Sequence, residues 1–292
     1  MTQKKLLVVL VLVALILYFS FRGILIGVSP GKIDHSNSSA VSSYLPRYGC
    51  PFRVHITKGS VTVTFKISGA NKTLNYTFYG QKASYLCFPS GGLLYVMYPG
   101  DPRTDTYAVF ITKDLKELWK AKFKGPLSPM FYSNGTLLFL KQGNEESNSK
   151  PCLYWVDLET GALSRKICLE EKHGASVGAV KFFKGRIYLT TSTGHIYLIE
   201  GSEVKRAYFD SIWGITVGAR IKLDVSEKYA AVAYSFANVE GKEKNGLCVF
   251  TSSLKKIACK SLKEEPQAVR IYGNTVYVWV GGKAKAYRIL RL

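Results

Sequence analysis

A repeated apolar strand segment constrains the fold of this chain more than any other feature of the sequence. It recurs five times between residues 80 and 292, and each copy has an aromatic or aliphatic residue at its centre. These central residues are Tyr95, Phe139, Tyr188, Val232 and Tyr277, which are 44, 49, 44 and 45 residues apart. A period in the forties is the length of a four-stranded β-propeller blade. The repeat therefore predicts an all-β fold with a propeller of five or six blades.

A hairpin follows the repeated segment in most units. Apolar and polar residues alternate along its arms, and polar turns join them, which is typical of strands and not of helices. The arms are clearest at residues 107–111 with 118–123, 153–156 with 163–169, and 247–250 with 257–259. A further arm, 195–199, turns at Gly201.

Two of these hairpins carry a cysteine on each arm. Cys152 and Cys168 lie almost symmetrically about Thr160, and Cys248 and Cys259 flank the turn of the other hairpin in the same way. Cysteines that face each other across a hairpin ladder have a Cα separation of about 5.5 Å, which suits a disulfide. The sequence therefore predicts one disulfide in each hairpin.

The remaining cysteines, Cys50 and Cys87, are predicted to form a third disulfide that ties the segment before the sheets to the first blade. Two alternatives are open at this point: six buried free thiols, or a zinc site. Zinc is the poorer alternative because the chain has no Cys-x2-Cys pair and only four histidines. The histidines are His35, His55, His173 and His195.

The N-terminal residues have the pattern of a membrane anchor. Lys4 and Lys5 precede an apolar run, residues 6–21, whose 16 residues cover ~24 Å as a helix. The hydrocarbon layer is about 30 Å thick, so the span is predicted to continue past Arg22 to Val28. Residues 1–28 are therefore predicted to be an uncleaved signal anchor with a cytoplasmic N-terminus. A cleaved signal peptide is the alternative, although no small-x-small cleavage site follows the run.

The cysteines and four Asn-x-Ser/Thr sequons agree with export of the part after the anchor. Residues 29–51 are rich in serine and are predicted to be a flexible stalk that holds the propeller, residues 52–292, away from the membrane. The predicted location is the surface of a cell or the envelope of a virion. The asparagines predicted to carry glycans are Asn37, Asn71, Asn75 and Asn134.

The formal net charge of +20 favours anionic partners. Lysines are scattered over most turns and exposed strand positions, and no cluster of basic and aromatic residues indicates a groove for an oligonucleotide. Besides the membrane, we therefore expect a protein or an anionic surface glycan as the partner, and no specific nucleic acid. The composition and the predicted disulfides also suggest an archaeal source.

Three short stretches resemble the PQQ-like, or quinoprotein-type, β-propeller repeat. Residues 156–163, VDLETGAL, match its turn, residues 115–119 supply its tryptophan, and residues 185–198 match its strand, turn and strand. The resemblance implies a propeller over residues 83–292. Enzymes of this family are eight-bladed dehydrogenases that hold a quinone and calcium beside an adjacent pair of cysteines. This chain is too short for eight blades and lacks that pair, so it resembles a non-enzymatic branch without a cofactor.

Other signals of enzymatic chemistry are weak. Residues 27–32 look like a phosphate-binding loop, but they have one residue too few between the glycines and no Ser or Thr after Lys32. The chain contains no His-Glu-x-x-His or Gly-x-Ser-x-Gly motif. We therefore expect no catalytic residues and no metal site.

The predicted binding face consists of connections between blades, where loops carry function on a rigid base. Trp213 lies in a long connection after Asp210, and residues 126–130 form a second candidate loop. His173 and His195 are further candidates for this face. Lone histidines beside turns are, however, more often ordinary surface or packing residues.

Closure of the propeller requires a strand from outside the last unit, because that unit ends after about three strands at residues 287–292. The segment 73–79 is predicted to supply this strand, which would remove exposed sheet edges. Alternatively, it forms a sixth blade with the predicted hairpin at residues 52–68.

These features favour a single-pass membrane-anchored propeller outside the cytoplasm that serves as a non-enzymatic binding or scaffold module. The alternative is an extracellular enzyme that acts on an acidic polysaccharide at the propeller axis. Its candidate carboxylates are Asp210, Asp224 and Glu227. Nucleic-acid binding is a third hypothesis, and it depends on charge alone.

Overall fold

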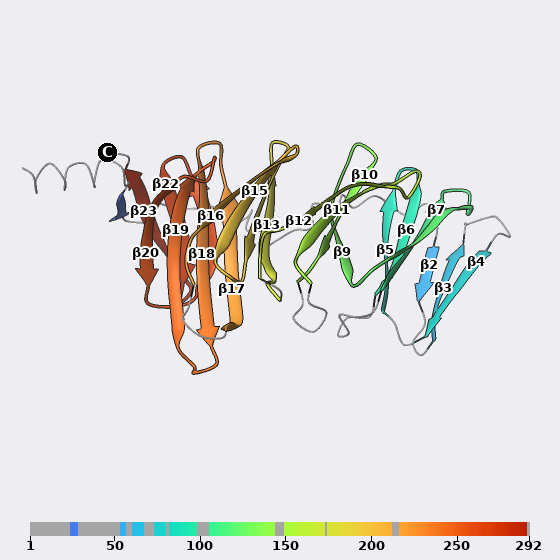
Figure 1. Ribbon diagram of the computed structural model, residues 1–292, viewed down its shortest axis with the longest axis horizontal. Helices are drawn as coiled ribbons and strands as arrows, with labels where there is room; N and C mark the ends of the chain where they lie inside the picture. The colour runs from blue at the N-terminus through green and yellow to red at the C-terminus, as the bar shows by residue number, and fades with distance from the viewer. Residues whose placement is uncertain are drawn as a thin grey trace, which may run out of the picture. The chain divides into compact units, whose positions relative to one another are not determined.

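The computed structural model describes residues 24–28, 53–56, 60–66, 73–79, 82–97, 105–143, 149–172, 174–211 and 216–290. All the regular elements in these ranges are β-strands, numbered β1 to β23 as in Figure 1. They form six antiparallel sheets, of which five have four strands and one has three. This confirms the all-β class and the repeated blade-like sheets that the sequence predicts.

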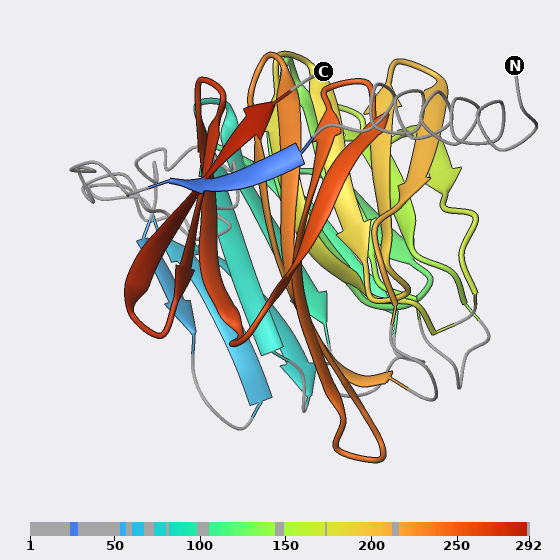
Figure 2. The same ribbon diagram turned by 90° about the vertical axis from the view of Figure 1, so that its left-hand side faces the viewer.

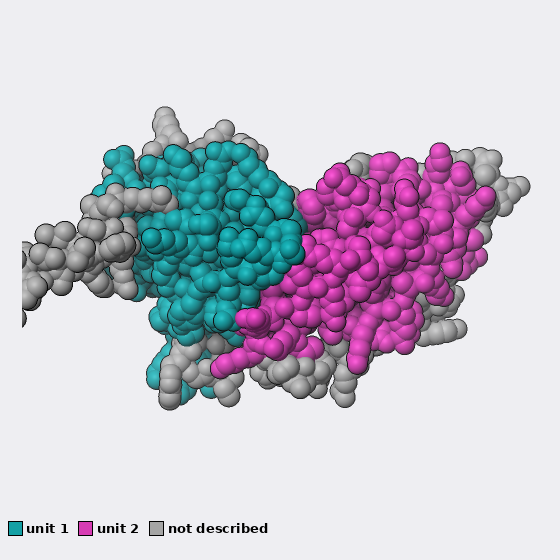
Figure 3. Space-filling model, turned by 45° about the horizontal axis from the view of Figure 1, so that its top comes forward, with its two compact units in different colours: residues 1–41, 177–292 teal, residues 42–176 magenta. Residues whose placement is uncertain are grey.

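Residues 42–176 form one of two compact units, which Figure 3 colours separately. It contains the three-stranded sheet and two of the four-stranded sheets. Their strands are β2 (Arg53–Ile56), β3 (Ser60–Lys66) and β4 (Thr73–Tyr79); β5 (Lys82–Phe88), β6 (Gly91–Met97), β7 (Thr106–Thr112) and β8 (Glu117–Phe123); and β9 (Leu127–Ser133), β10 (Thr136–Lys141), β11 (Cys152–Asp157) and β12 (Leu163–Cys168).

The other unit consists of residues 1–41 and 177–292 and contains the remaining three sheets. The first sheet consists of β13 (Val177–Phe183), β14 (Arg186–Thr191), β15 (His195–Glu200) and β16 (Glu203–Tyr208). The second consists of β17 (Thr216–Val225), β18 (Tyr229–Asn238), β19 (Glu243–Thr251) and β20 (Lys256–Leu262). The last sheet consists of β21 (Pro266–Tyr272), β22 (Thr275–Val280), β23 (Lys283–Leu290) and β1 (Ile24–Val28). Five sheets after residue 80 agree with the five repeat units.

Short turns connect neighbouring strands, and the sequence supplies residues that fit them. Asn134 and Gly135 join β9 to β10 with φ values of +48° and +76°. Lys184 and Gly185 join β13 to β14 with the same pair of values. Positive φ at both central residues is the backbone conformation of a type I′ hairpin turn, which matches the twist of the strands.

The tryptophan and the Asp-x-x-Thr-Gly turn that carry the family resemblance contact each other. Trp119 on β8 donates its indole N–H to the carbonyl oxygen of Leu158 at 2.8 Å. A Cβ atom at Gly161, where φ is +71°, would lie 2.5 Å from the Trp119 ring. Asp157 closes the turn, because its Oδ1 accepts hydrogen bonds from the backbone N–H and the hydroxyl of Thr160 at 2.8 and 2.7 Å. The motif residues thus join the β5–β8 sheet to the β9–β12 sheet.

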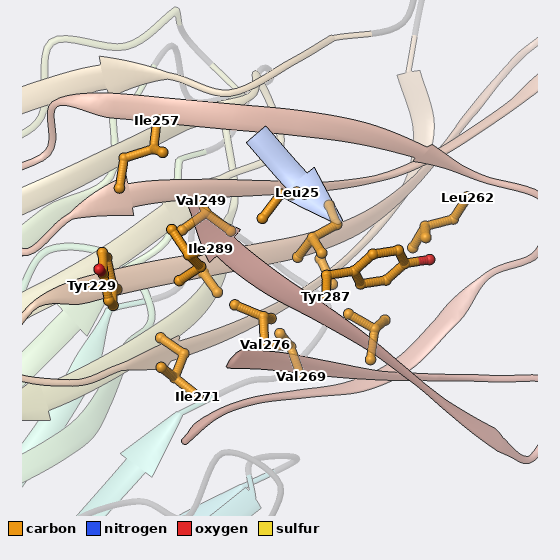
Figure 4. Close-up of a cluster of buried hydrophobic side chains, with 14 of the residues drawn as sticks. Leu25, Tyr229, Val249, Ile257, Leu262, Val269, Ile271, Val276, Tyr287 and Ile289 are labelled. Carbon is orange, nitrogen blue, oxygen red and sulfur yellow. The ribbon is translucent and has the colours of Figure 1, made fainter. Parts of the chain in front are cut away.

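In the unit that contains residues 177–292, the β17–β20 sheet packs against a sheet on each side. The first strands of the three sheets, β13, β17 and β21, contact one another in that order. Val249, Val276 and Ile289 belong to a buried cluster between the β17–β20 sheet and the last sheet (Figure 4). Tyr188 and Phe236 belong to a second cluster on the other side of the β17–β20 sheet.

Strand β1 completes the last sheet and corrects two predictions. It pairs with β23, from Ile24 opposite Leu290 to Val28 opposite Ala286 (Figure 2). The predicted closing strand, 73–79, is instead β4 and pairs with β3, as the alternative of a further sheet requires. The edge of β23 thus receives a hydrogen-bonding partner from the N-terminal side of the chain.

The prediction that the membrane span continues to Val28 is wrong for residues 24–28. Leu25 is buried in the core of the last sheet, whereas Ile26 is 46% exposed. This alternation is that of a strand at a sheet edge. A short apolar run that directly follows a longer one does not reveal by hydrophobicity alone where a membrane segment ends and a strand begins.

The rest of the predicted anchor, residues 1–23, and the predicted stalk, residues 29–51, lie outside the described residues. No helix in the described ranges is long and apolar enough to cross a membrane. The number of blades and the closure of the sheets into one ring stay predictions.

Candidate functional site

A set of polar and aromatic residues surrounds Asp210, which lies at the start of the connection between β16 and β17. We call this set the Asp210 cluster. It contains side chains from the β13–β16 and β17–β20 sheets. Its members are His195, Tyr208, Asp210, Ser211, Tyr234, Lys244 and Lys256.

Asp210 is the centre of the cluster. Its Oδ2 accepts a hydrogen bond from the Tyr234 hydroxyl at 2.5 Å, and its Oδ1 accepts one from Lys244 Nζ at 2.7 Å. The backbone N–H of Ser211 also donates to Oδ1, at 2.9 Å. Burial, and then the Asp210 carboxylate, raise the pKa of Tyr234, so its hydroxyl stays protonated as a donor. Both carboxylate oxygens are therefore fixed by donors of the chain itself.

Two glycines allow the backbone to approach so closely here. Gly194 has a φ of +86°, and a Cβ atom there would lie 1.4 Å from the carbonyl oxygen of Asp210. Its own carbonyl oxygen accepts a hydrogen bond from the N–H of Phe209 at 2.8 Å. A Cβ atom at Gly246 would lie 2.2 Å from the Tyr234 hydroxyl. Only glycine fits these positions without displacing its neighbours.

The aromatic part of the cluster surrounds Tyr208, which is 46% exposed. His195 packs edge-on against it with ring centroids 5.6 Å apart, and Lys256 Nζ lies 5.6 Å from the centroid of the Tyr208 ring. Lys256 also donates to the carbonyl oxygen of Phe209 at 3.1 Å, and the Tyr208 and Ser211 hydroxyls are 2.6 Å apart. The cluster therefore has a rigid base and a partly exposed aromatic ring beside a cation.

The predicted binding-face residues have different outcomes. His195 belongs to the Asp210 cluster, where Thr193 Oγ1 lies 3.3 Å from its Nδ1. Trp213 and His173 lie outside the described residues. The second predicted loop, 126–130, is corrected because residues 127–130 belong to strand β9, with Leu127 buried. An apolar segment with two prolines looks like a loop in sequence, although proline is tolerated at strand starts and bulges.

Asp224 occupies a different position and joins three sheets. Its Oδ1 lies 3.2 Å from Lys181 Nζ on β13 and 3.7 Å from Arg270 on β21. Its Oδ2 accepts the backbone N–H of Ile271 at 2.9 Å, and only 9% of its side chain is exposed. The third candidate carboxylate, Glu227, forms an exposed ion pair with Lys184. Asp224 and Glu227 thus each pair with a lysine of the β13–β16 sheet.

Both predicted hairpin disulfides are present. Cys152 and Cys168 are bonded with a Cα separation of 4.0 Å, and Cys248 and Cys259 with one of 4.1 Å. These separations are shorter than the 5.5 Å expected, as suits facing positions that do not exchange backbone hydrogen bonds. Each bond ties the outermost strand of a sheet to the strand before it.

The other cysteine and asparagine predictions stay open. Cys87 is disulfide-bonded, and its predicted partner, Cys50, lies outside the described residues. No cysteine in the described part of the chain is free, so the free-thiol and zinc alternatives do not apply to those cysteines. Asn75 on β4 and Asn134 in the β9–β10 turn are exposed, whereas Asn37 and Asn71 are not described. Glycosylation stays a prediction for all four.

Sequence reasoning missed the partners of Asp210. Tyr234 and Lys244 are 24 and 34 residues away along the chain, so no local pattern connects them to it. A partial signal existed in Gly246, because glycine within a strand often indicates the close approach of another group. The side chain that approaches it is that of Tyr234.

No protein-family model matches the chain, and no curated protein matches it. Among solved structures it is similar to Sqt1 of Saccharomyces cerevisiae, with 12% identity over 82% of this chain and 70% of that one, and a TM-score of 0.44. It is also similar to the Pan2 WD40 domain of Neurospora crassa, with 13% identity, coverages of 77% and 71%, and a TM-score of 0.40. BamB of Moraxella catarrhalis matches with 8% identity, coverages of 91% and 98%, and a TM-score of 0.28. Because these TM-scores are low, the fold is described here from the strands and sheets of this chain and not from the similar structures.

Proposed function

We propose that this chain is a non-enzymatic binding or scaffold module, anchored by residues 6–21 in a membrane, with its sheets on the outer surface of a cell or a virion. The observation that carries this proposal is the Asp210 cluster. Asp210 and Lys244 are fixed by each other, while Tyr208 remains exposed beside Lys256. A rigid base with an exposed aromatic ring is suited to binding, because little conformational entropy is lost on association.

Two features support the outer location. Disulfides persist in oxidising compartments, and the chain has two hairpin disulfides in its described part. Four sequons are available for glycans in such a compartment. The apolar run 6–21 after Lys4 and Lys5 supports an anchor with a cytoplasmic N-terminus.

The proposed partner is a protein or an anionic surface glycan. The net charge of +20 attracts anionic partners over distances of about a Debye length. Exposed cations beside aromatic rings add to this attraction. Lys166, for example, has its Nζ 5.4 Å from the centroid of the Tyr154 ring on the β9–β12 sheet.

The alternative of an enzyme that acts on an acidic polysaccharide has less support. A glycosidase of the common type needs two carboxyl groups beside the scissile bond. Asp210, Asp224 and Glu227 are each held by a cation of the chain. No observation on the described residues favours this alternative over binding.

The outer location is tested by non-reducing peptide mapping of protein from its native membrane. We expect linked Cys152–Cys168 and Cys248–Cys259 peptides, a third pair of Cys50 with Cys87, glycans on Asn75 and Asn134, and residues 6–21 still attached. Two results together would contradict the outer location: asparagines without glycans, and sheets that an external protease cleaves only after the cells are broken.

The binding role is tested by cross-linking on intact membranes. The variant Tyr208→Ala should lose its cross-linked partner, and the matched control is Tyr85→Ala. The two tyrosines have similar exposed fractions, 46% for Tyr208 and 40% for Tyr85. Equal cross-linking by both variants, with unchanged thermal unfolding, would overturn the role of the Asp210 cluster.

A further inference from the structure

The distance along the chain between the proposed membrane span and the first strand is very short. The apolar run ends at Phe21, and β1 begins at Ile24, so only Arg22 and Gly23 lie between them. Consecutive Cα atoms are 3.8 Å apart at most, so Ile24 lies within about 11 Å of Phe21. The strand is therefore held at the membrane surface whenever the run before it spans the bilayer.

The start of β1 defines one end of the last sheet. Ile24 pairs with Leu290, and the turn between Tyr272 and Thr275 is at the same end, because Thr275 pairs with Arg288. We call this the Ile24 end. In Figure 2, β1 runs alongside β23 near the point marked C.

Contacts between sheets extend the Ile24 end to the neighbouring sheets of the same unit. Near the starts of β17 and β21, Arg220 contacts Glu265 at 2.5 Å. Near their ends, Asp224 accepts the N–H of Ile271. The two strands are therefore parallel. Strand β13 runs the same way, because a Cβ at Gly178 would touch Ile221, and Lys181 pairs with Asp224.

The turns at the two ends of these three sheets differ in charge. At the Ile24 end, the turns and the strand residues beside them carry four basic and three acidic residues, and at the opposite end they carry three basic and five acidic residues in the described part. Lys256 is left out of this count because its backbone lies at the Ile24 end but its Nζ belongs to the Asp210 cluster. We call the opposite end the Asn238 end. The residues at the Ile24 end are Lys184, Arg186, Lys228, Lys255, Glu200, Glu203 and Glu227. Those at the Asn238 end are Lys242, Lys263, Lys283, Asp210, Glu240, Glu243, Glu264 and Glu265.

We propose that the Ile24 end is a lipid-contacting surface that lies on anionic phospholipid headgroups, with the Asn238 end directed away from the membrane. This inference deepens the proposed function and rests on the anchor at residues 6–21. The short connection fixes which end is near the bilayer, and the excess of basic residues there is attracted to anionic lipid. Tyr272, which is 50% exposed at this end, is of the kind enriched at membrane interfaces.

This orientation directs the Asp210 cluster away from the lipid. Lys244 pairs with Phe236 in the β18–β19 ladder, two positions from Asn238, so the cluster is on the side of the Asn238 end. It also changes the role of residues 29–51. They follow β1 along the chain, so they do not separate the last sheet from the membrane, as a stalk between anchor and propeller would.

The test uses the full chain in vesicles that contain anionic phospholipid and a headgroup-bound energy acceptor. A fluorescent amino acid replaces either Tyr272 or Val239, which is 58% exposed beside Asn238. A noncanonical residue avoids any change to the disulfides. Strand β18 has ten residues and spans ~33 Å, so we expect at least about twofold more quenching at 272 than at 239. Equal quenching, or more at 239, would overturn the orientation.

Two insertions of ten flexible residues supply a matched control. An insertion between Arg22 and Gly23 should reduce the quenching at 272, because it lengthens the connection to β1. The same insertion after Ser42 should leave it unchanged, because β1 precedes that position. The reverse result would mean that residues 29–51 are the spacer and would overturn the inference.

Alkaline extraction of the same vesicles separates the two proposals. Protein that remains in the membrane but is quenched equally at both positions retains its anchor and contradicts only the orientation. Protein that is released by alkali lacks the anchor, which contradicts both. If quenching at positions 272 and 239 becomes equal in vesicles of purely neutral lipid, the headgroup charge contributes to the orientation. A difference that persists there would leave the short connection as its cause and would contradict the part assigned to anionic lipid.

Discussion

Single residues in this protein act mainly by joining neighbouring sheets. Trp119 contacts the turn at Asp157, and Asp224 contacts residues of β13 and β21. Asp210 accepts hydrogen bonds from residues of β18 and β19. The contacts of Trp119 and Asp224 satisfy polar groups that are partly or fully buried. An unsatisfied polar group at such a place would cost about 1–3 kcal/mol.

Replacing Trp119 by phenylalanine should therefore destabilise the unit formed by residues 42–176. The variant loses the hydrogen bond to Leu158 and part of the ring that packs on Gly161. We expect a loss of about 2 kcal/mol in the free energy of unfolding, measured by urea denaturation. Trp155→Phe is the control, because Trp155 is half-buried like Trp119 and its ring lies under Arg165. Losses of the same size in both variants would contradict the assigned role of the indole N–H.

Asp157 makes stability depend on acid pH. The hydroxyl and the backbone N–H of Thr160 hold its pKa below the usual value of 3.8. A group with a lowered folded-state pKa stabilises the fold above its unfolded-state pKa, and this contribution is lost as the pH falls through the folded-state pKa. Asp157→Asn should therefore lower the Tm at pH 6 and have a smaller effect at pH 2. A deficit in Tm that grows toward pH 2 would contradict this account.

At the scale of elements, the sheet is the unit of construction, and two sheets are completed by bonds outside the backbone ladder. The disulfides fasten the outermost strands β12 and β20. The last sheet instead obtains its outermost strand, β1, from the N-terminal side of the chain. A strand at a sheet edge is the one most easily lost by local unfolding, which explains why these edges have additional fastening.

Two neighbouring residues of β1 provide a direct test of its role. Leu25 is 8% exposed and belongs to the cluster shown in Figure 4, whereas Ile26 is 46% exposed. Leu25→Ala should lower the free energy of unfolding by about 2–3 kcal/mol, and Ile26→Ala by less than about 0.5 kcal/mol. Hydrogen exchange of β23 in the full chain should report the same order. Equal effects would contradict the pairing of β1 with the last sheet.

At the scale of the whole molecule, a closed ring of blades stays a prediction, and its cooperativity provides a test. Blades that close into one ring share every interface, so they should unfold in one transition. Two independent units, residues 42–176 and the rest, should unfold in two. We expect a single calorimetric transition in the full chain. Two well-separated transitions would contradict closure.

The repeat determined the all-β class and the five sheets after residue 80, because a period in the forties and strand alternation are local properties of the sequence. The hairpin disulfides were equally predictable, since Cys152 and Cys168 flank a turn that fixes the register. The end of the apolar N-terminal run was not, because Leu25 in a lipid bilayer and Leu25 in a sheet have the same hydrophobicity.

The tertiary structure alone decided which segment completes the last sheet and which residues surround Asp210. The segments 24–28 and 73–79 are both short, apolar and capable of forming a strand. The choice between them depends on which one buries its apolar face against the exposed core of β21–β23. Similarly, Tyr234 and Lys244 reach Asp210 only after two sheets have packed together. Packing between distant segments is a property of the assembled fold, and the local sequence does not contain it.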